Sequence, residues 1–242
     1  MPRLEIDRGL VPAQETFAEE AWPRRCGGLR GEPARWTAGR DREVVVAIKI
    51  ELPVSAERIR ELRVGDEVLV SGRLVTARDA AHRALVRGLD EPVKAALDGR
   101  FIYHCGPVVA QDPASGGWRF VAAGPTASMR EEPWQAEVIA RYGVRGVIGK
   151  GGMGPRTLAA LREHGAVYLH AVGGLAVTLA RRVVRVHGVH LLDELGVTEA
   201  IWDVEVQDFP AVVTMDAHGE TLHARAEAPD GPTATSPSGG GP

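Results

Sequence analysis

The stretch VRGVIGKGGMGPRTLAALREHGAVYLHA, residues 144–171, decides the fold of this chain. It opens with a short apolar run, Val144–Ile148, which is typical of a buried strand. Pro155 suits the first position of a helix, and Gly165 suits the residue just after the end of that helix. A second apolar run, Ala166–Ala171, follows at once. Strand, helix and strand in this order predict an α/β unit with parallel strands.

The alternation continues on both sides of this unit. A strand is expected at Trp118–Ala123, a helix at Trp134–Tyr142, and a further helix from Leu175 to about Arg182. Two late strands, Ile201–Gln207 and Ala211–Asp216, are expected to pair with each other. The remaining elements are predicted as strands Val44–Leu52, Glu67–Ser71 and Phe101–Ala110, and as helices Ala56–Leu62 and Ala77–Arg87. Together they predict an α/β fold with a mixed sheet and flanking helices.

Composition narrows the classes of partner. The 242 residues carry a net charge of −3, so a nucleic-acid partner is not expected. No apolar run approaches the ~20 residues that span a bilayer, and the N-terminus lacks a secretory core, so a cytoplasmic protein without a membrane segment is predicted. Residues 1–43 are predicted to form an irregular extension, 44–222 the folded domain, and 223–242 a disordered tail rich in Gly, Pro and Ser.

Cysteine is scarce. Cys26 and Cys105 are the two cysteines of the chain, and they do not form a Cys-x-x-Cys pair. Their separation argues against a disulfide scaffold and against a self-contained zinc or iron–sulfur site, which needs several ligands close together. The chain alone is therefore not expected to hold a thiolate-ligated cluster.

Two glycine-flanked segments, Gly124–Arg130 and Gly149–Gly154, each follow an apolar, strand-like run and each carry a single cation. Twenty residues separate Arg130 from Lys150, about the length of one helix and one strand. Ligands in α/β sheets bind beyond the carboxyl ends of the strands. We therefore expect both cations at neighbouring strand ends, facing one anionic ligand.

The segment around Lys150 admits three interpretations. A nucleotide-binding loop would need Gly-Lys-Ser/Thr, but Gly151 follows the lysine here. A glycine-rich turn with a solvated lysine is the structural alternative. The interpretation we favour is an anion site at the N-terminus of the helix that begins at Pro155, with Lys150 supplying charge.

The segment Thr126–Arg130 admits two interpretations that are compatible. Its hydroxyls can cap a helix that begins near Met129, or Arg130 can bind a carboxylate with both arms of its guanidinium. On the predicted helix upstream, Arg78 and His82 share one face, which alone indicates a solvated surface.

The other histidines give weaker signals. His187 and His190 lack a third metal ligand and are predicted to be a surface pair beside a turn. For His104 and Cys105 we expect a buried structural role.

Taken in order, these segments resemble a known family. The β component of class I fumarase and L-tartrate dehydratase is similar in four motifs: Arg-Asp-Ala-Ala-His (78–82), Tyr-His-Cys-Gly-Pro (103–107), Gly-Pro-Thr-x-Ser-x-Arg (124–130) and Lys-Gly-Gly-Met-Gly (150–154). The likeness covers about residues 44–220. It implies a swivelling β/β/α domain of the iron–sulfur hydro-lyase C-terminal type.

The resemblance also implies an activity and a partner. It implies a β subunit that hydrates or dehydrates a small dicarboxylic acid, such as fumarate, malate or tartrate. In the family, a separate α subunit or domain carries a [4Fe–4S] cluster on three cysteines, so an α2β2-like hetero-oligomer is expected. An inactive relative that binds or senses a small acid is the alternative function.

The resemblance assigns roles to residues of this chain. Arg78, Ser128, Arg130 and Lys150 are implied to bind the substrate, and Thr126 and Lys150 to take part in catalysis. A threonine hydroxyl is a weak base unless nearby cations lower its pKa. The family usually has two adjacent threonines, whereas the second position here is Ala127. This departure predicts an altered substrate.

Overall fold

The computed structural model describes residues 47–111, 113 and 116–223. The predicted N-terminal extension and all but the first residue of the predicted tail lie outside these residues, so both stay predictions, as do the predicted domain limits. Among the described residues, no helix is long and apolar enough to cross a membrane.

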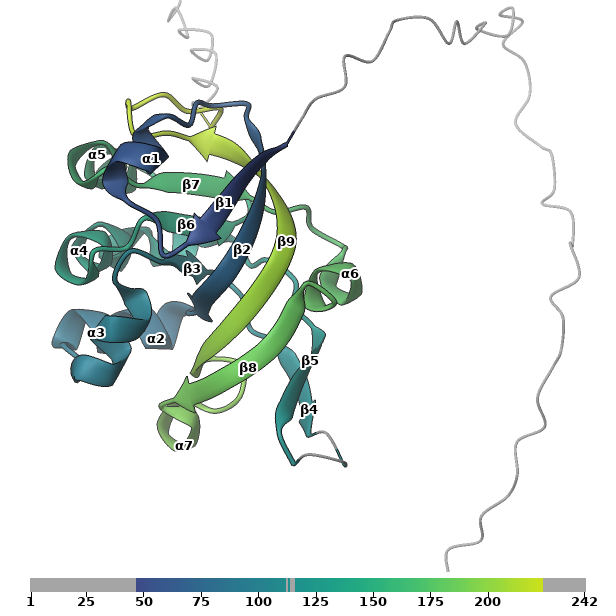
Figure 1. Cartoon of the computed structure of the whole chain (residues 1–242). Coiled ribbons are helices and arrows are strands. Elements are labelled where there is room, and N and C mark those ends of the chain that lie inside the picture. Colours follow the sequence, from purple (N-terminus) through teal and green to yellow (C-terminus); the bar gives the residue numbers. More distant parts are fainter. Residues whose placement is uncertain (1–46, 112, 114–115, 224–242) are drawn as a thin grey trace, which may run out of the picture. The chain divides into compact units, whose positions relative to one another are not determined.

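The core of the domain is a seven-stranded mixed sheet with strand order β1-β2-β3-β6-β7-β9-β8 (Figure 1). Neighbours among β1, β2, β3, β6 and β7 run parallel, whereas β9 runs antiparallel to β2, β7 and β8. Because β9 bonds to both β2 and β7, the strands β2, β3, β6, β7 and β9 close into a ring. The strands are β1 Ile48–Leu52, β2 Glu67–Thr76, β3 Phe101–Tyr103, β6 Gly146–Gly149, β7 Val167–His170, β8 Val183–His190 and β9 Ile201–Met215.

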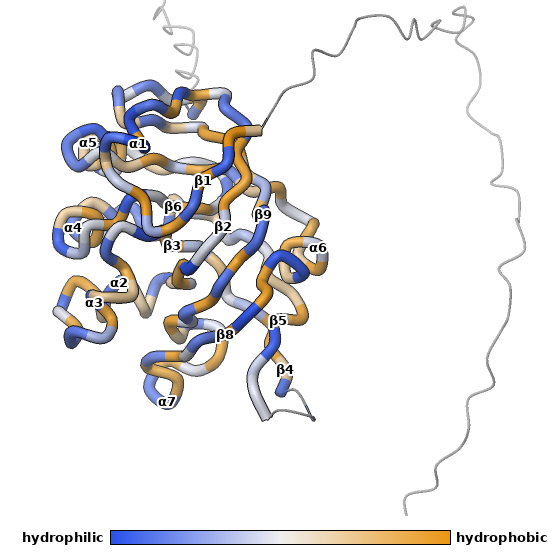
Figure 2. The backbone as a smooth tube through the Cα atoms, in the orientation of Figure 1, coloured by the Kyte–Doolittle hydropathy of each residue, from blue (hydrophilic) through white to orange (hydrophobic). Residues whose placement is uncertain are grey.

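Alternate residues of the ring face two separate apolar cores. In β3, Phe101 and Tyr103 belong to one core and Ile102 belongs to the other, as the two-residue period of a strand requires. The second core also takes in residues of four helices, α2, α3, α4 and α5, which lie on one side of the sheet (Figure 1). Helices α3, α4 and α5 each carry hydrophilic as well as hydrophobic residues (Figure 2), as expected of helices with one buried face.

The helices are short and fall between the strands. Their bounds are α1 Ala56–Arg60, α2 Asp79–Arg87, α3 Glu91–Leu97, α4 Glu132–Tyr142, α5 Pro155–His164, α6 Ala176–Ala180 and α7 Leu192–Leu195, with a 3-10 turn, η1, at Ser128–Glu131. A separate hairpin pairs β4 Val108–Gln111 with β5 Trp118–Ala122.

The strand–helix–strand unit at the centre of the sequence is confirmed. Helix α5 begins at Pro155 and is followed by Gly165 in the left-handed conformation, with φ 65°. Strands β6 and β7 on either side of it pair in parallel. The mixed α/β class with flanking helices is confirmed as well.

The predicted pair of late strands is wrong, because residues 201–215 form the single strand β9. Asp208 and Pro210 indicate a turn locally, but here they bend a continuous strand around the ring. Asp208 adopts φ 48° and donates its backbone N–H to Ser71 Oγ at 3.1 Å, and the β2–β9 register shifts near Val70. Closure of the ring thus replaces the expected hairpin.

Several other limits differ from the predictions. The run predicted as one strand from Phe101 to Ala110 divides into β3 and β4, because Gly106-Pro107 interrupts it. Strand β2 continues five residues beyond the predicted Ser71, to Thr76. Strand β8 and helix α3 were not predicted. His187 and His190 therefore lie in β8 rather than beside a turn, and His187 Nε2 contacts Glu205 at 3.0 Å.

Candidate functional site

The two glycine-flanked segments lie side by side, although the first follows β5 of the separate hairpin rather than a strand of the main sheet. Ala127 and Lys150 form a parallel bridge, in which the Lys150 N–H donates to the Thr126 carbonyl at 3.2 Å and the Ser128 N–H to the Lys150 carbonyl at 3.0 Å. The hydroxyl of Thr126 donates to the carbonyl of His104 at 3.0 Å. The bridge holds Thr126 and Lys150 together at the carboxyl end of β6.

Arg78 precedes helix α2 and is mostly buried. Its Nη1 lies 3.5 Å from Glu199 Oε1, and the other Glu199 oxygen accepts the Ala80 N–H at 3.0 Å. The side chain packs against Gly106, where an added Cβ would overlap the guanidinium. The glycine of the Tyr-His-Cys-Gly-Pro motif therefore leaves room for Arg78.

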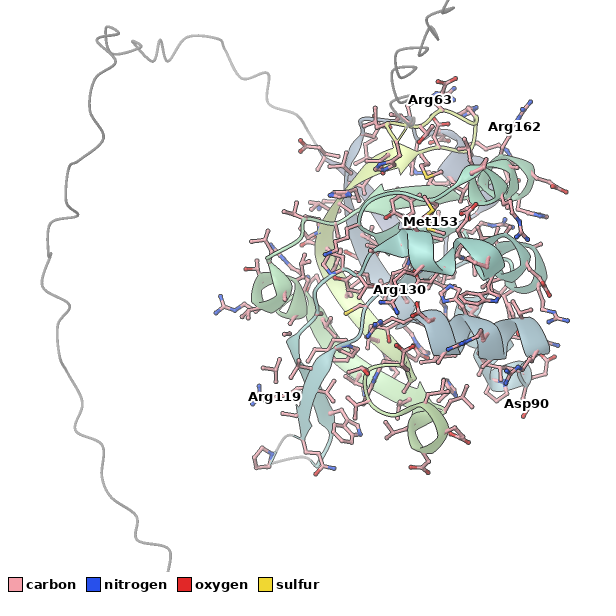
Figure 3. All side chains as sticks on the ribbon, turned by 180° about the vertical axis from the view of Figure 1, so that it is seen from behind. Arg63, Asp90, Arg119, Arg130, Met153 and Arg162 are labelled. Carbon is pink, nitrogen blue, oxygen red and sulfur yellow. The ribbon has the colours of Figure 1, made fainter. Side chains whose placement is uncertain are left out.

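Arg130 is anchored beside the same helix. Its guanidinium forms an ion pair with Asp79, the first residue of α2, yet half of the Arg130 side chain stays exposed. In Figure 3 it lies next to the start of that helix. Because Asp79 follows Arg78 directly, both arginines lie at the start of α2, and Thr126 is in the same segment as Arg130.

Lys150 differs from the two arginines in having no acidic partner. Among the described residues, no carboxylate lies within ion-pair distance of its ammonium group, and the residue is exposed. Its stem lies near Gly173 in the loop after β7. The site thus offers one cation whose charge is not balanced within the described part of the chain.

Ser128 is placed differently from the other predicted residues. It is fully buried, and its hydroxyl contacts Tyr168 Oη at 2.9 Å and His104 Nδ1 at 2.8 Å. An added Cβ on Gly149 would overlap this hydroxyl, so the glycine is needed for close approach. A direct contact of Ser128 with substrate stays a prediction, and it would require these hydrogen bonds to be exchanged.

A buried polar network lies behind the exposed side chains. His82 and His104 are fully buried, and the side-chain amide of Gln135 contacts Nε2 of both, at 2.9 and 2.8 Å. The expectation that His82 lies on a solvated face is therefore wrong. The buried structural role expected of His104 and Cys105 is confirmed by their burial.

The protonation of this network follows from its acceptors. The Arg78 carbonyl can only accept, so His82 Nδ1, at 2.9 Å from it, carries a proton. Burial lowers the pKa of both histidines, so each is neutral and Nε2 of His82 must accept. Gln135 therefore presents its NH₂ group to both rings, and His104 Nδ1 donates to Ser128.

The anion site predicted at the N-terminus of α5 is already occupied by the chain itself. The Glu132 carboxylate accepts the backbone N–H groups of Gly154, Arg156 and Thr157 at 2.8, 3.0 and 3.2 Å, and the Thr157 hydroxyl at 2.5 Å. The N-terminus of α5 is therefore not free to bind an anion together with Lys150.

Sequence reasoning missed the acids of the site. Asp79, Glu131 and Glu132 lie within or beside the four motifs, whereas Glu199 lies far beyond them, and the partners of these acids are distant in sequence. The one available signal was the adjacency of Asp79 to Arg78 and of Glu131 to Arg130.

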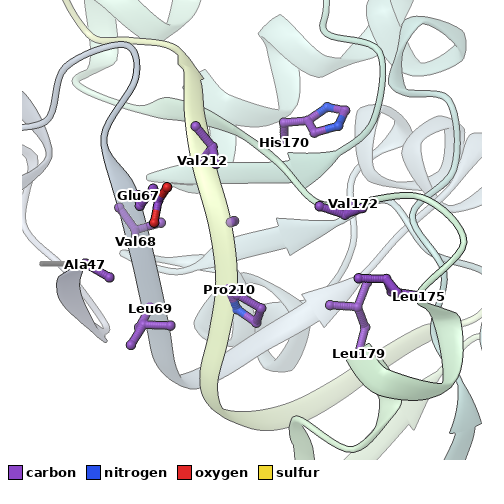
Figure 4. Close-up of a pocket in the computed structure, with 11 residues that line it drawn as sticks. Ala47, Glu67, Val68, Leu69, His170, Val172, Leu175, Leu179, Pro210 and Val212 are labelled. Atoms are coloured by element: carbon purple, nitrogen blue, oxygen red, sulfur yellow. The ribbon is translucent and has the colours of Figure 1, made fainter. Parts of the chain in front are cut away.

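The hollow shown in Figure 4 is a different feature. It encloses about 150 Å³ and its lining is mostly apolar, with Val172, Leu175 and Leu179 on one side and Val68 and Leu69 on the other. None of the four predicted cation and threonine positions lines it. The candidate site is an exposed face rather than this pocket.

Comparison with known proteins gives a consistent family. Residues 28–226 match the model of the fumarase C-terminus family. The putative fumarate hydratase class I of Geobacillus stearothermophilus is 50% identical over 180 residues, which are 74% of this chain and 34% of that protein. This chain thus spans about a third of the length of that relative.

Two relatives are closer to this chain in length. The L(+)-tartrate dehydratase subunit beta of Escherichia coli (strain K12) is 40% identical over 71% of this chain and 84% of its own length. The putative L(+)-tartrate dehydratase subunit beta of Methanocaldococcus jannaschii is 39% identical over 68% of this chain and 85% of its own length.

Proposed function

This chain belongs to the fumarase C-terminus family, and we propose that it is the β subunit of a heteromeric, iron–sulfur-dependent hydro-lyase. Its substrate is a small dicarboxylic acid of the fumarate, malate or tartrate kind. The observation that carries the proposal is the gathering of Arg78, Thr126, Arg130 and Lys150, with the charge of Lys150 unpaired within the described part of the chain.

The residues of this chain supply binding and orientation. Arg130 and Lys150 are exposed and bind carboxylate oxygens of the substrate, and Arg78 stabilises the negative charge that grows when a proton leaves the carbon beside a carboxylate. The Thr126 hydroxyl directs its own proton to the His104 carbonyl, so its lone pairs are free for the substrate. Nearby positive charge favours its deprotonation if it acts as a base.

The donor set of the described residues does not fit an iron–sulfur cluster. Cys105 is the one cysteine within the described residues, and burial of its sulfur raises its pKa to about 12. Thiolates are the ligands of such clusters, so a buried, protonated thiol is a poor candidate. The described residues also contain no cluster of His, Cys, Asp and Glu suited to a metal. The proposed cluster is therefore assigned to an α subunit.

The family membership and the mixed sheet also support a proposal about assembly. We place the domain in the swivelling β/β/α type, closing over the α subunit in an α2β2-like complex. The exposure of Arg130 and Lys150 supports a site that a second chain completes.

The test is co-expression of this chain with the α-type chain of its source, one bearing three cluster cysteines. The complex is reconstituted without oxygen and assayed with fumarate, L-malate, tartrate and mesaconate. Lys150→Ala should abolish turnover and leave association of the two chains intact. Lys94→Ala is the matched control, because Lys94 is an exposed lysine that pairs only with Glu91.

Two results would contradict the proposal. Absence of turnover from a complex with a reconstituted cluster would favour an acid-binding or regulatory module. Wild-type rates from the Lys150→Ala complex would remove the role of the lysine.

A further inference from the structure

A second acid lies behind Arg130 and is used by none of the steps above. Glu131 is fully buried at the end of η1, directly after Arg130 in sequence. Its carboxyl group interacts with that of Asp79, the residue that forms the ion pair with Arg130, and the 3-10 turn η1 packs against helix α2. Arg130, Asp79 and Glu131 therefore form a continuous chain from the exposed face into the interior.

In the part of the chain that the structure describes, the buried carboxyl oxygens of Asp79 and Glu131 lack hydrogen-bond donors. Within the described residues, neither oxygen of Glu131 nor the buried Oδ1 of Asp79 receives a hydrogen bond from an N–H or hydroxyl group. Two facing carboxylates with no donor between them repel, and a buried carboxylate without a partner is costly. One proton shared between them satisfies both groups.

The surrounding charges place that proton on Glu131. Burial, followed by Asp79, raises the pKa of Glu131 to about 8. Burial also opposes ionisation of Asp79, but its interaction with Glu131 and the charges of Arg130 and Arg78 hold its pKa below the usual value. Asp79 is therefore the ionised member of the pair.

Within the described residues, Arg130 and the backbone of Glu131 favour ionisation of Glu131, but less strongly than burial and Asp79 oppose it. His104 Nδ1 is 3.9 Å from Glu131 Oε2, too far for a hydrogen bond, and burial lowers the pKa of His104. Tyr168 also acts electrostatically on this region, but burial raises its pKa to about 12, so it is neutral. His82 is buried and neutral as well.

We propose that Asp79 and Glu131 share one proton, and that this protonated pair positions Arg130 toward a substrate carboxylate, which makes Glu131 a positioning residue of the site. The role toward substrate rests on the proposed function, whereas the shared proton does not. With the proton present, Asp79 neutralises Arg130 with a single charge. Without it, a second negative charge lies behind the binding face.

Loss of the shared proton is expected to weaken substrate binding. Loss of the proton above about pH 8 adds a negative charge near a bound dianion, so KM rises while kcat changes less. One unit charge some 8 Å away, at an effective dielectric constant of 20 to 80, corresponds to a KM increase of roughly two- to thirtyfold. The increase should be larger for a dicarboxylate than for a monocarboxylate analogue.

The test has one arm that requires no activity. In the full-length chain labelled with ¹³C at glutamate side-chain carboxyls, NMR should show one resonance titrating near pH 8 that is missing in Glu131→Gln. Asp79→Asn should move the same titration to lower pH, because it removes the neighbouring charge. If the resonance lost in Glu131→Gln titrates near the ordinary glutamate pKa of about 4.3, the shared proton is refuted.

The second arm measures KM from about pH 7 to 9 in the complex with the α chain. The alkaline increase should disappear in Glu131→Gln, which keeps a donor toward Asp79 but cannot ionise. Glu137→Gln, an exposed carboxylate on α4 that pairs with Arg141, should retain it. An increase that survives Glu131→Gln overturns the positioning role. A titration near pH 8 in a complex without turnover would instead refute the proposed function and leave the proton pair standing.

Discussion

Glu132→Ala should destabilise the domain by removing the cap of a distant helix. The Glu132 carboxylate accepts three backbone N–H groups at the start of α5 and the hydroxyl of buried Thr157. Loss of a helix N-cap costs about 0.5–2 kcal/mol. A buried polar group left without a partner costs about 1–3 kcal/mol more. Water can reach the exposed Arg156 N–H, so we expect a total near 3 kcal/mol rather than a sum over four bonds.

Urea unfolding and thermal melts of the full-length chain measure this loss. For a domain of this size, 3 kcal/mol corresponds to a decrease in Tm of about 6–12 °C. The matched control is Glu137→Ala, because Glu137 lies on the same helix α4 and forms only an exposed ion pair with Arg141 at 3.7 Å. Such a pair contributes about 0.3–0.5 kcal/mol.

The same variant tests the charge at the helix end. With Glu132 removed, the free N–H groups of α5 form an anion site, so millimolar sulfate should restore part of the stability. Sulfate also stabilises proteins generally, so the comparison is with its effect on Glu137→Ala. Equal losses in the two alanine variants, or equal responses to sulfate, would refute the capping role of Glu132.

Three further predictions concern the site. Gly149→Ala places a methyl group on the Ser128 hydroxyl and should lower the free energy of unfolding by about 1–3 kcal/mol, as measured in urea. Gly188→Ala is the control, because the space around Gly188 is open. The free energy of unfolding of Glu131→Gln should rise relative to that of wild type as pH rises from about 4.5 to 8, as measured by urea unfolding. In this range the Glu131 carboxyl holds a proton in the native state that it has lost in the unfolded state. A difference that stays constant with pH would contradict this. Ala127→Thr, on an exposed position, should leave the fold intact and shift the ratio of kcat/KM between tartrate and fumarate in the reconstituted complex; an unchanged ratio would contradict the role given to this position.

Local signals explain what the sequence could predict. Helix α5 was predictable because Pro155 and Gly165 act on the backbone of their own positions. The neighbouring strands β6 and β7 were predictable because each is a short apolar run next to that helix. The meeting of Thr126 with Lys150 did not follow from this reasoning, because Thr126 comes after β5 of the separate antiparallel hairpin, and the contact is made by the bridge between Ala127 and Lys150.

Long-range closure explains what could not be predicted. Asp208 and Pro210 have the local chemistry of a turn, yet β9 passes through them because pairing with β2 continues on both sides. Glu132 lies in the first turn of α4, yet its carboxylate caps α5, which begins 23 residues later in the chain. His82 looked solvated because its partner Gln135 lies 53 residues away. In each case the deciding contact is between segments far apart in the chain.

The ion pairs of the site leave little positive charge for a ligand. Arg78 is paired with Glu199 and Arg130 with Asp79, so within the described residues a single positive charge, on Lys150, is left for a ligand. Under the proposed function, Lys150 binds one carboxylate of the dicarboxylic acid and Arg130, whose charge is balanced by Asp79, binds the other. Ionisation of Glu131 would add a negative charge that offsets the unpaired charge of Lys150. We therefore expect tight binding of a dicarboxylic acid only while the Asp79–Glu131 pair keeps its proton.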